Sequence, residues 1–306
     1  MIGRQILFHR HFLGYTGGHG KVWDYFNHAL ALGWDARVYL TPDSVRGPDN
    51  PFTSVPERIQ LQWAPEDADL LFLAGMDWTA LAEGQAHAPV VNLIQHVRHA
   101  DPALPLRSFL RRPASRICVS AAVARAIQGT DEVVGPVTVI PAALDLAPAA
   151  GLRAGPDAAP VLIAALKNPP LGQALADQLR AQGLEVALLQ APLPRAAYLQ
   201  AMLQAKVVVA LPHPTEGFFL PGLEAMGLAR AVVMPPCQGS DEYAVAEENC
   251  LMPEDSPSAL ATAVQRLLEQ PQLYARLVAR GQVTAAAHTQ SAERAAFAAV
   301  LEGMAA

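Results

Sequence analysis

The stretch VVVALPHPTEGFFLPGLEAMGLARAVVMPP, residues 207–236, decides the fold. Its first run of β-branched residues, 207–211, predicts a buried strand, and a second run at 231–234 predicts the next strand. Between them lie a turn rich in Pro and Gly and a helix predicted over 220–228. Strand, helix and strand in this order are the repeating unit of a parallel α/β sheet.

The same alternation of short apolar runs with amphipathic or alanine-rich segments extends over the whole chain. In the first half it predicts strands at 5–9, 36–41, 58–63, 69–74, 90–96, 116–120 and 137–141, with helices at 21–32, 78–86 and 121–128. In the second half it predicts strands at 161–165, 185–190, 207–211, 231–234 and 250–252, with helices at 171–182, 195–205, 220–228, 257–269, 271–288 and 292–304. Residues 41–57 read as a loop.

The length of 306 residues suits two domains. A segment rich in Ala, Gly and Pro, without periodicity, follows Asp145 and predicts a linker. We therefore expect a Rossmann-like domain at 1–146, a linker at 147–158, a second Rossmann-like domain at 159–289, and a terminal helix at 290–306 that can cross back. Ligands of open parallel sheets bind outside the carboxyl ends of the strands, so two such domains facing each other predict a central cleft.

Composition excludes several classes of protein. The net charge is -6 and 16% of residues are charged, which argues against general nucleic-acid binding and against a disordered chain. The three cysteines show no C-x-x-C spacing, which favours a reducing compartment. No signal peptide or membrane-spanning run is evident, so we expect a cytoplasmic protein.

One basic run allows two interpretations. Arg107, Arg111, Arg112 and Arg116 lie close together in the sequence. They form either an ordinary solvated surface or a contact for anionic lipid head groups or a charged acceptor. The second interpretation would place the protein at the inner face of the membrane as a peripheral protein.

The loop and helix within 207–236 carry the strongest indication of chemistry. Gly217 and Gly222 allow the backbone to approach a ligand closely. The start of the helix offers unpaired N–H groups suited to a diphosphate. Glu216 lies in the loop and Glu224 lies on the helix, so one carboxylate can bind sugar hydroxyls and the other ribose hydroxyls.

This segment, Glu216 to Met226, resembles the E-x7-E element of retaining GT-B glycosyltransferases of the family-4 type. The resemblance implies the GT-B fold, with 1–146 as the acceptor domain and 159–289 as the nucleotide-sugar donor domain. It also implies that Glu216 binds the transferred sugar and Glu224 the nucleotide ribose. It also implies that backbone groups just after Glu216 hold the sugar and phosphate of the donor; these residues are Gly217, Phe218, Phe219 and Leu220. The family usually has Gly where this chain has Phe219.

The resemblance extends to other parts of the chain, namely 116–120, 139–145, 193–207 and 249–252. The loop at 15–21, with Gly17 and Gly18, is similar to the glycine loop that approaches the donor phosphates and the acceptor in this family. His96, at the end of a predicted strand, resembles the active-site His of the family, and His99 is its rival.

Lys167 resembles the first of two basic residues that neutralise the leaving diphosphate. Gly172 stands where the second is expected, so either Lys167 acts alone or Arg195 or Lys21 supplies the second charge. A metal route is the alternative, because Asp67-Ala68-Asp69 formally matches a D-x-D motif. That motif precedes its strand here rather than following it, and we expect neither a metal nor another cofactor.

The function implied is transfer of a sugar from a nucleotide-diphosphate sugar to a hydroxyl acceptor. The acceptor would be a glycan, a lipid-linked molecule or a small molecule, in bacterial surface glycan, lipopolysaccharide or glycolipid synthesis. Three alternatives stay open: a non-catalytic nucleotide-sugar-binding subunit, a GT-B epimerase, and a phosphorylase, for which no lysine motif for pyridoxal phosphate is recognisable.

Overall fold

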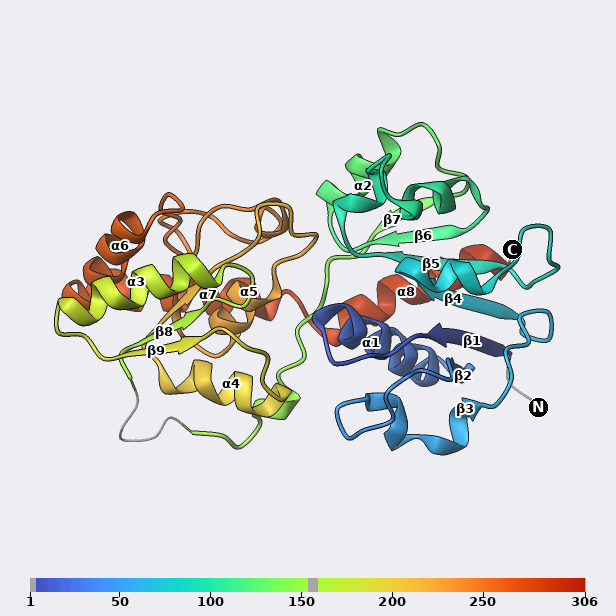
Figure 1. Cartoon of the computed structure of the whole chain (residues 1–306), viewed down its shortest axis with the longest axis horizontal. Helices are drawn as coiled ribbons and strands as arrows, with labels where there is room; N and C mark the ends of the chain where they lie inside the picture. The colour runs from blue at the N-terminus through green and yellow to red at the C-terminus, as the bar shows by residue number, and fades with distance from the viewer. Residues whose placement is uncertain (1–3, 154–158, 306) are drawn as a thin grey trace. The chain divides into compact units, whose positions relative to one another are not determined.

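A computed structural model describes residues 4–153 and 159–305, which form two compact α/β units (Figure 1). Unit 1 consists of residues Met1–Ala142 and Gln290–Ala306, and unit 2 of residues Ala143–Thr289. By this division the linker predicted at 147–158 belongs to unit 2, and its residues 154–158 lie outside the described part of the chain. The helix expected at 290–306 belongs to unit 1.

In the described residues, unit 1 contains a seven-stranded sheet with every pairing parallel, in the order β3-β2-β1-β4-β5-β6-β7. Its strands are β1 (Gln5–Arg10), β2 (Asp35–Leu40), β3 (Ile59–Gln60), β4 (Leu70–Ala74), β5 (Val90–Ile94), β6 (Ser115–Cys118) and β7 (Val137–Val139). The order reverses between β1 and β4, so the crevice outside their carboxyl ends is where a ligand of such a sheet binds.

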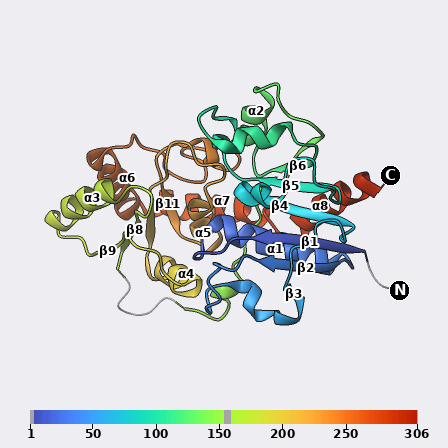
Figure 2. The same cartoon turned by 45° about the vertical axis from the view of Figure 1, so that its right-hand side comes forward.

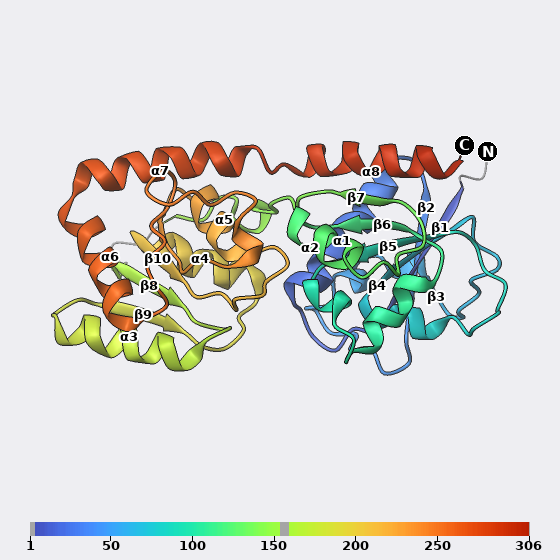
Figure 3. The ribbon, with the colours of Figure 1, turned by 90° about the horizontal axis from the view of Figure 1, so that it is seen from above.

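In the described residues, the α-helices of unit 1 are α1 (Gly17–Ala31), α2 (Ala121–Gln128) and α8 (Gln290–Ala305), and they cover the sheet. Figure 3 shows α8 running along the sheet, and its Phe297 packs edge-on against Tyr25 of α1 and Phe72 of β4. Glu293 of α8 lies 2.8 Å from the ammonium of Lys21 and 2.9 Å from His28. Because these charges are buried, the packing of α8 against α1 depends on their pairing with one another.

Unit 2 contains a four-stranded parallel sheet in the order β11-β10-β8-β9, as far as the chain is described. The strands are β8 (Val161–Ala164), β9 (Val186–Leu189), β10 (Val207–Ala210) and β11 (Ala231–Val233), and the helices are α3 (Pro169–Ala181), α4 (Arg195–Gln204), α5 (Leu220–Gly227), α6 (Pro257–Glu269) and α7 (Pro271–Ala286).

Successive residues of the buried strands of unit 2 point to opposite faces of the sheet and pack in two separate hydrophobic cores. Val207 and Val209 pack with α3 and α6 on one face, whereas Val208 and Ala210 pack with α4 and α5 on the other. Figure 2 shows these two helix pairs on either side of the sheet. Both faces are covered, which is why the strands are continuously apolar in sequence.

Four predicted elements differ from the structure. The segment 41–57, predicted as a loop, contains the 3-10 helix Pro51–Ser54 and the start of another, Pro56–Arg58, and the strand predicted at 58–63 is reduced to Ile59–Gln60. The helix predicted at 78–86 is a 3-10 helix, Gly75–Ala80, and Gly84 then takes a positive φ of 75° that a continuing α-helix does not allow. In the described residues, the strand predicted at 250–252 forms only two isolated bridges, from Leu251 to Val233 and from Cys250 to Ala246.

The basic run of unit 1 is tied into the protein. Arg116 is buried and donates to backbone carbonyls that include those of Leu110 (2.7 Å) and Arg112 (2.7 Å). Arg107 and Arg111 both contact Glu132, and Arg112 lies over the ring of Trp78. The interpretation as a solvated surface is therefore wrong for Arg116. Within residues 4–153 and 159–305, no helix combines the length and apolar content needed to cross a bilayer.

Candidate functional site

The carboxyl ends of β8 and β10 bring two predicted residues of unit 2 together. The strand order of the unit 2 sheet reverses between β8 and β10. Lys167 follows β8 and Glu216 follows β10, and the Lys167 Nζ lies 3.7 Å from the Glu216 Oε1. The same carboxylate oxygen accepts a hydrogen bond of 3.2 Å from the backbone N–H of His213. The Lys167 side chain is 57% exposed, so its ammonium can turn toward a bound anion.

The backbone after Glu216 presents free donors. Within the described residues, no hydrogen bond engages the backbone N–H of Gly217 or of Phe218. The next N–H, of Phe219, donates to the Gly239 carbonyl at 2.9 Å. A Cβ on Gly239 would lie 2.9 Å from the Phe219 nitrogen and 2.9 Å from the Glu216 Cβ, so only glycine fits there. The contact with Gly239 thus holds the loop in place, while the N–H groups of Gly217 and Phe218 stay available to a ligand.

Phe219 and Leu220 make structural contacts within unit 2. Phe219 is 2% exposed, packs in the core of unit 2, and accepts a hydrogen bond from the Tyr243 hydroxyl. The Leu220 N–H donates to the Phe218 carbonyl at 3.2 Å. The N–H groups of these two residues are thus used within the loop, and their contact with the donor stays a prediction.

Glu224 and Arg195 form a second pair in unit 2. Glu224, on α5, is 3% exposed, and its Oε1 lies 2.7 Å from a guanidinium nitrogen of Arg195, at the start of α4. Arg195 also donates to the Asp145 carbonyl at 2.9 Å. Burial, together with the Glu224 charge, raises the pKa of the neighbouring Tyr198 well above its usual value. A buried carboxylate is costly without a cation, and Arg195 supplies that cation.

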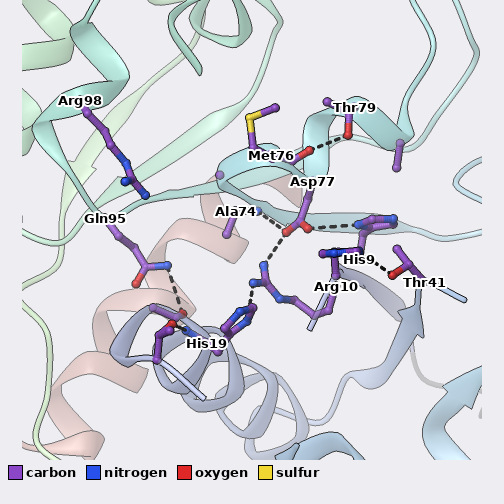
Figure 4. A pocket seen from close by; sticks show the side chains of 15 residues that line it. His9, Arg10, His19, Thr41, Ala74, Met76, Asp77, Thr79, Gln95 and Arg98 are labelled. Atoms are coloured by element: carbon purple, nitrogen blue, oxygen red, sulfur yellow. Dashed lines mark hydrogen bonds and ion pairs between the residues drawn. The ribbon is translucent and has the colours of Figure 1, made fainter. Parts of the chain in front are cut away.

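Unit 1 has a pocket of about 510 Å³ at the carboxyl ends of β1, β4 and β5 (Figure 4). At its floor, Asp77 is 5% exposed and accepts from Arg10 at 2.6 Å. Asp77 also lies 3.1 Å from the Nδ1 of His9, and it accepts from the Ala74 N–H at 2.9 Å. The second terminal nitrogen of Arg10 lies 2.8 Å from the Nδ1 of His19. Burial and the Arg10 charge lower the pKa of His19 to about 4.

Of the residues predicted as functional in unit 1, only some line this pocket. Gly18 lines it, and its carbonyl accepts from the Gln95 side chain at 3.2 Å; Gly17 begins α1. Lys21 is paired with Glu293 and Asp24, so it does not supply the second positive charge for a diphosphate.

His96 is not among the residues lining the pocket, although Gln95 and Arg98 beside it are. Its Nδ1 accepts a hydrogen bond of 3.1 Å from the Arg98 N–H and so begins a 3-10 helix. Its rival His99 is buried, and burial, with a smaller contribution from Arg98, lowers its pKa to about 3. The structure shows this local contact for His96, and its catalytic role stays a prediction.

Sequence reasoning missed the network formed by His9, Arg10, His19 and Asp77. Polar residues at the end of a buried strand were the available indication, since His9 and Arg10 close an otherwise apolar β1. Their partner Asp77 follows β4, which is adjacent to β1 in the sheet but distant in the sequence.

The D-x-D segment lies at the amino ends of the strands, whereas this pocket lies at their carboxyl ends. Asp69 precedes β4, and its Oδ2 accepts a hydrogen bond of 2.6 Å from the Gln5 N–H at the start of β1. In the described part of the chain, no three His, Cys, Asp or Glu side chains cluster as metal ligands would.

Residues 152–270 match the family described as "Glycosyl transferases group 1". Sucrose-phosphate synthase from Thermosynechococcus elongatus is 15% identical with a TM-score of 0.72, covering 98% of this chain and 99% of that one. HepE of Anabaena with UDP and glucose is 16% identical with a TM-score of 0.72, covering 98% and 100%. HepE with UDP-glucose is 18% identical with a TM-score of 0.71, covering 98% and 99%.

The fold is GT-B. These solved structures share the GT-B fold with this chain, and residues 152–270, which match the group 1 glycosyltransferase model, belong to unit 2. Among curated protein sequences, none matches.

Proposed function

We propose that this chain is a retaining glycosyltransferase that moves a sugar from a nucleotide-diphosphate sugar to a hydroxyl acceptor, without a metal ion. The observation that carries the proposal is the geometry of the loop after β10. There, the Glu216 carboxylate and the Lys167 ammonium lie 3.7 Å apart, next to the free N–H groups of Gly217 and Phe218. The carboxylate can accept hydrogen bonds from sugar hydroxyls, and the Lys167 ammonium and the two N–H groups can bind a diphosphate. Together these groups suit a sugar joined to a diphosphate.

Each group has a role in the transfer. The bond between the anomeric carbon and the diphosphate oxygen breaks, and the acceptor oxygen forms the new glycosidic bond on the same face. The acceptor proton goes to the leaving diphosphate. Lys167 and the N–H groups stabilise the negative charge that develops on that diphosphate, a contribution made mainly in the transition state.

The two carboxylates divide the donor between them. Glu216 accepts hydrogen bonds from hydroxyls of the transferred sugar, and Glu224 accepts them from the nucleotide ribose. Arg195 pairs with Glu224 and holds it in place, as their 2.7 Å contact supports. His96 keeps its predicted catalytic role in this proposal.

The acceptor is a glycan, a lipid-linked molecule or a small molecule. The proposed setting is the synthesis of bacterial surface glycan, lipopolysaccharide or glycolipid, at the cytoplasmic face of the membrane.

A thermal-shift screen of nucleoside diphosphates and nucleotide sugars tests donor binding, because a ligand that binds only the native state raises the melting temperature. We expect the nucleoside diphosphate of one base to raise the melting temperature more than those of the other bases. Calorimetry on Lys167→Ala should then show weaker diphosphate binding, while Lys206→Ala, an exposed lysine of the same unit, should bind as the wild type does.

Slow release of nucleoside diphosphate from the selected sugar nucleotide should follow, and Lys167→Ala should lower kcat as well as kcat/KM. Binding without any hydrolysis or transfer would favour the non-catalytic subunit. A screen in which no nucleoside diphosphate stabilises the protein would contradict the proposal altogether.

A further inference from the structure

The pocket of unit 1 is lined by far more basic than acidic side chains. Arg10, Arg98 and the three histidines 9, 11 and 19 line it, against the single acid Asp77. Asp77 is not available to repel an anion, because its charge is paired with Arg10 within 2.6 Å in a buried contact. Among the described residues, the Arg98 guanidinium makes no hydrogen bond or ion pair, and the residue is exposed. The uncompensated charge of the pocket is therefore positive.

The pair of Asp77 and Arg10 fixes the hydrogen-bonding state of two histidines. An arginine only donates, so the Nδ1 of His19 must accept from it at 2.8 Å, and the neutral ring carries its proton on Nε2. A carboxylate only accepts, so the Nδ1 of His9 must donate to Asp77 at 3.1 Å, which leaves the Nε2 of a neutral His9 as an acceptor. One ring thus offers a donor and the other an acceptor.

These groups lie on different sides of the pocket. Figure 4 shows Arg98, Gln95 and His19 on one side, and His9 and Thr41 on the other. The first side also has the backbone of Gly18 in the first turn of α1, where the N–H of Gly18 has no hydrogen bond within the described residues. That side offers donors and positive charge, as an anionic group requires. The other side offers both donors and acceptors, as sugar hydroxyls require.

We propose that this pocket binds a sugar that carries an anionic group, with Arg98 contacting the anion and Asp77 acting as a positioning residue for His9 and His19. The volume of about 510 Å³ is ample for such a molecule. Naming this sugar as the acceptor rests on the proposed function, whereas its binding does not. A phosphate and a carboxylate share the required chemistry.

Calorimetry with glucose 6-phosphate, glucuronate, glucose and inorganic phosphate tests the proposal on the full chain. We expect glucose 6-phosphate or glucuronate to bind at least about tenfold more tightly than glucose. The tighter of the two identifies the anion as phosphate or carboxylate. Equal affinity for glucose would overturn the role of the charge, and inorganic phosphate binding as tightly as glucose 6-phosphate would overturn the role of the sugar.

Arg98→Ala should weaken the preferred anionic sugar by about tenfold or more, since a charge-assisted contact is lost. The matched control is Arg125→Ala, an exposed arginine on α2 of the same unit, which should bind it as the wild type does. An Arg98→Ala variant with wild-type affinity would refute the contact.

Lys167→Ala separates this site from the donor site. It should weaken binding of nucleoside diphosphates and leave the anionic sugar unaffected. If UDP displaces glucose 6-phosphate, or if Lys167→Ala weakens both equally, the sugar occupies the donor site and the proposal is wrong. A wild-type protein that binds the anionic sugar but no nucleoside diphosphate would count against the proposed function only.

Long-range ¹⁵N–¹H NMR spectra of the histidine rings test the positioning role of Asp77. The wild type should show His9 protonated on Nδ1 and His19 protonated on Nε2. In Asp77→Asn the amide carries no charge to hold Arg10, so the fixed tautomers of His9 and His19 should be lost. The opposite tautomers in the wild type would overturn the role of Asp77.

Discussion

The guanidinium of Arg195 lies 2.7 Å from the carboxylate of Glu224, and this contact joins the first residue of α4 to the buried face of α5. Glu224 is 3% exposed, so its charge is tolerated because Arg195 stands beside it. Arg195 also reaches the Asp145 carbonyl at 2.9 Å. Arg195, a candidate for the second positive charge at the diphosphate, is therefore paired with Glu224, the carboxylate predicted to bind the ribose.

Arg195→Ala should lower the free energy of unfolding by about 2–3 kcal/mol, because it leaves a buried carboxylate without its cation. The expected loss is below that of a fully buried pair, since the Arg195 side chain is 23% exposed. Urea unfolding measures it. Arg276→Ala, an exposed arginine of the same unit, should change stability by less than about 0.5 kcal/mol. Adding Glu224→Gln to Arg195→Ala should recover part of the loss; equal stability of the single variant and the wild type would contradict the argument.

Stability should fall as the pH is lowered from 6.5 toward 3, in part because of His99. Burial lowers the pKa of His99 from 6.5 to about 3 in the folded protein. Between these values the unfolded chain binds the proton and the folded chain does not, so stability decreases with falling pH by up to about 1.4 kcal/mol per pH unit.

Because carboxylates titrate in the same range, the observable is the difference between wild type and His99→Gln in urea unfolding at several pH values. The variant should lose less stability than the wild type over this window. Parallel curves for the two proteins would mean that His99 takes up its proton in the folded state as readily as in the unfolded one.

The fold was predictable because both sheets are buried on two faces. Runs such as Val207–Ala210 are uniformly apolar, and the strand pattern follows from them. The helix predicted at 78–86 failed because the Asp77 carboxylate turns back to the Ala74 N–H, and because Gly84 adopts a positive φ. Both are local contacts that apolar periodicity does not reveal.

The site of unit 2 was more predictable than the pocket of unit 1. Glu216 and Glu224 lie eight positions apart on one loop and helix, so spacing alone relates them. Arg10 and Asp77 come from β1 and from the turn after β4, and only the order of the strands brings them together. Phe219 illustrates a different limit: its place in the motif suggested a ligand contact, but its size and apolar surface put it in the core.

Activity should persist in excess EDTA. Asp67 and Asp69 precede β4, whereas ligands of a parallel sheet bind beyond the carboxyl ends of its strands. Asp69 is also engaged with the Gln5 N–H at 2.6 Å. Transfer from the nucleotide sugar found in the screen should proceed at an unchanged rate with and without the chelator. A rate abolished by EDTA and restored by manganese or magnesium would contradict the metal-independent mechanism.

Glu216 and Glu224 should bind different parts of the donor, Glu216 the sugar and Glu224 the ribose. Each carboxylate has its own cation, Lys167 at 3.7 Å for Glu216 and Arg195 at 2.7 Å for Glu224, and the loop with its free N–H groups lies between them in sequence. An extended donor with its diphosphate at these N–H groups would place its sugar at one carboxylate and its ribose at the other. Losing one carboxylate should therefore weaken only the ligands that carry the matching hydroxyls.

Calorimetry on both variants with two ligands gives the four affinities that decide this division. Glu224→Gln should weaken the nucleoside diphosphate and the whole sugar nucleotide alike, by about ten- to a hundredfold. Glu216→Gln should leave the nucleoside diphosphate almost unaffected, weaken the sugar nucleotide and reduce turnover. Gln keeps the shape of each side chain, so a folding defect does not imitate the result. If Glu216→Gln weakens the nucleoside diphosphate as much as Glu224→Gln does, both carboxylates serve the nucleotide, and the sugar must be bound by other residues.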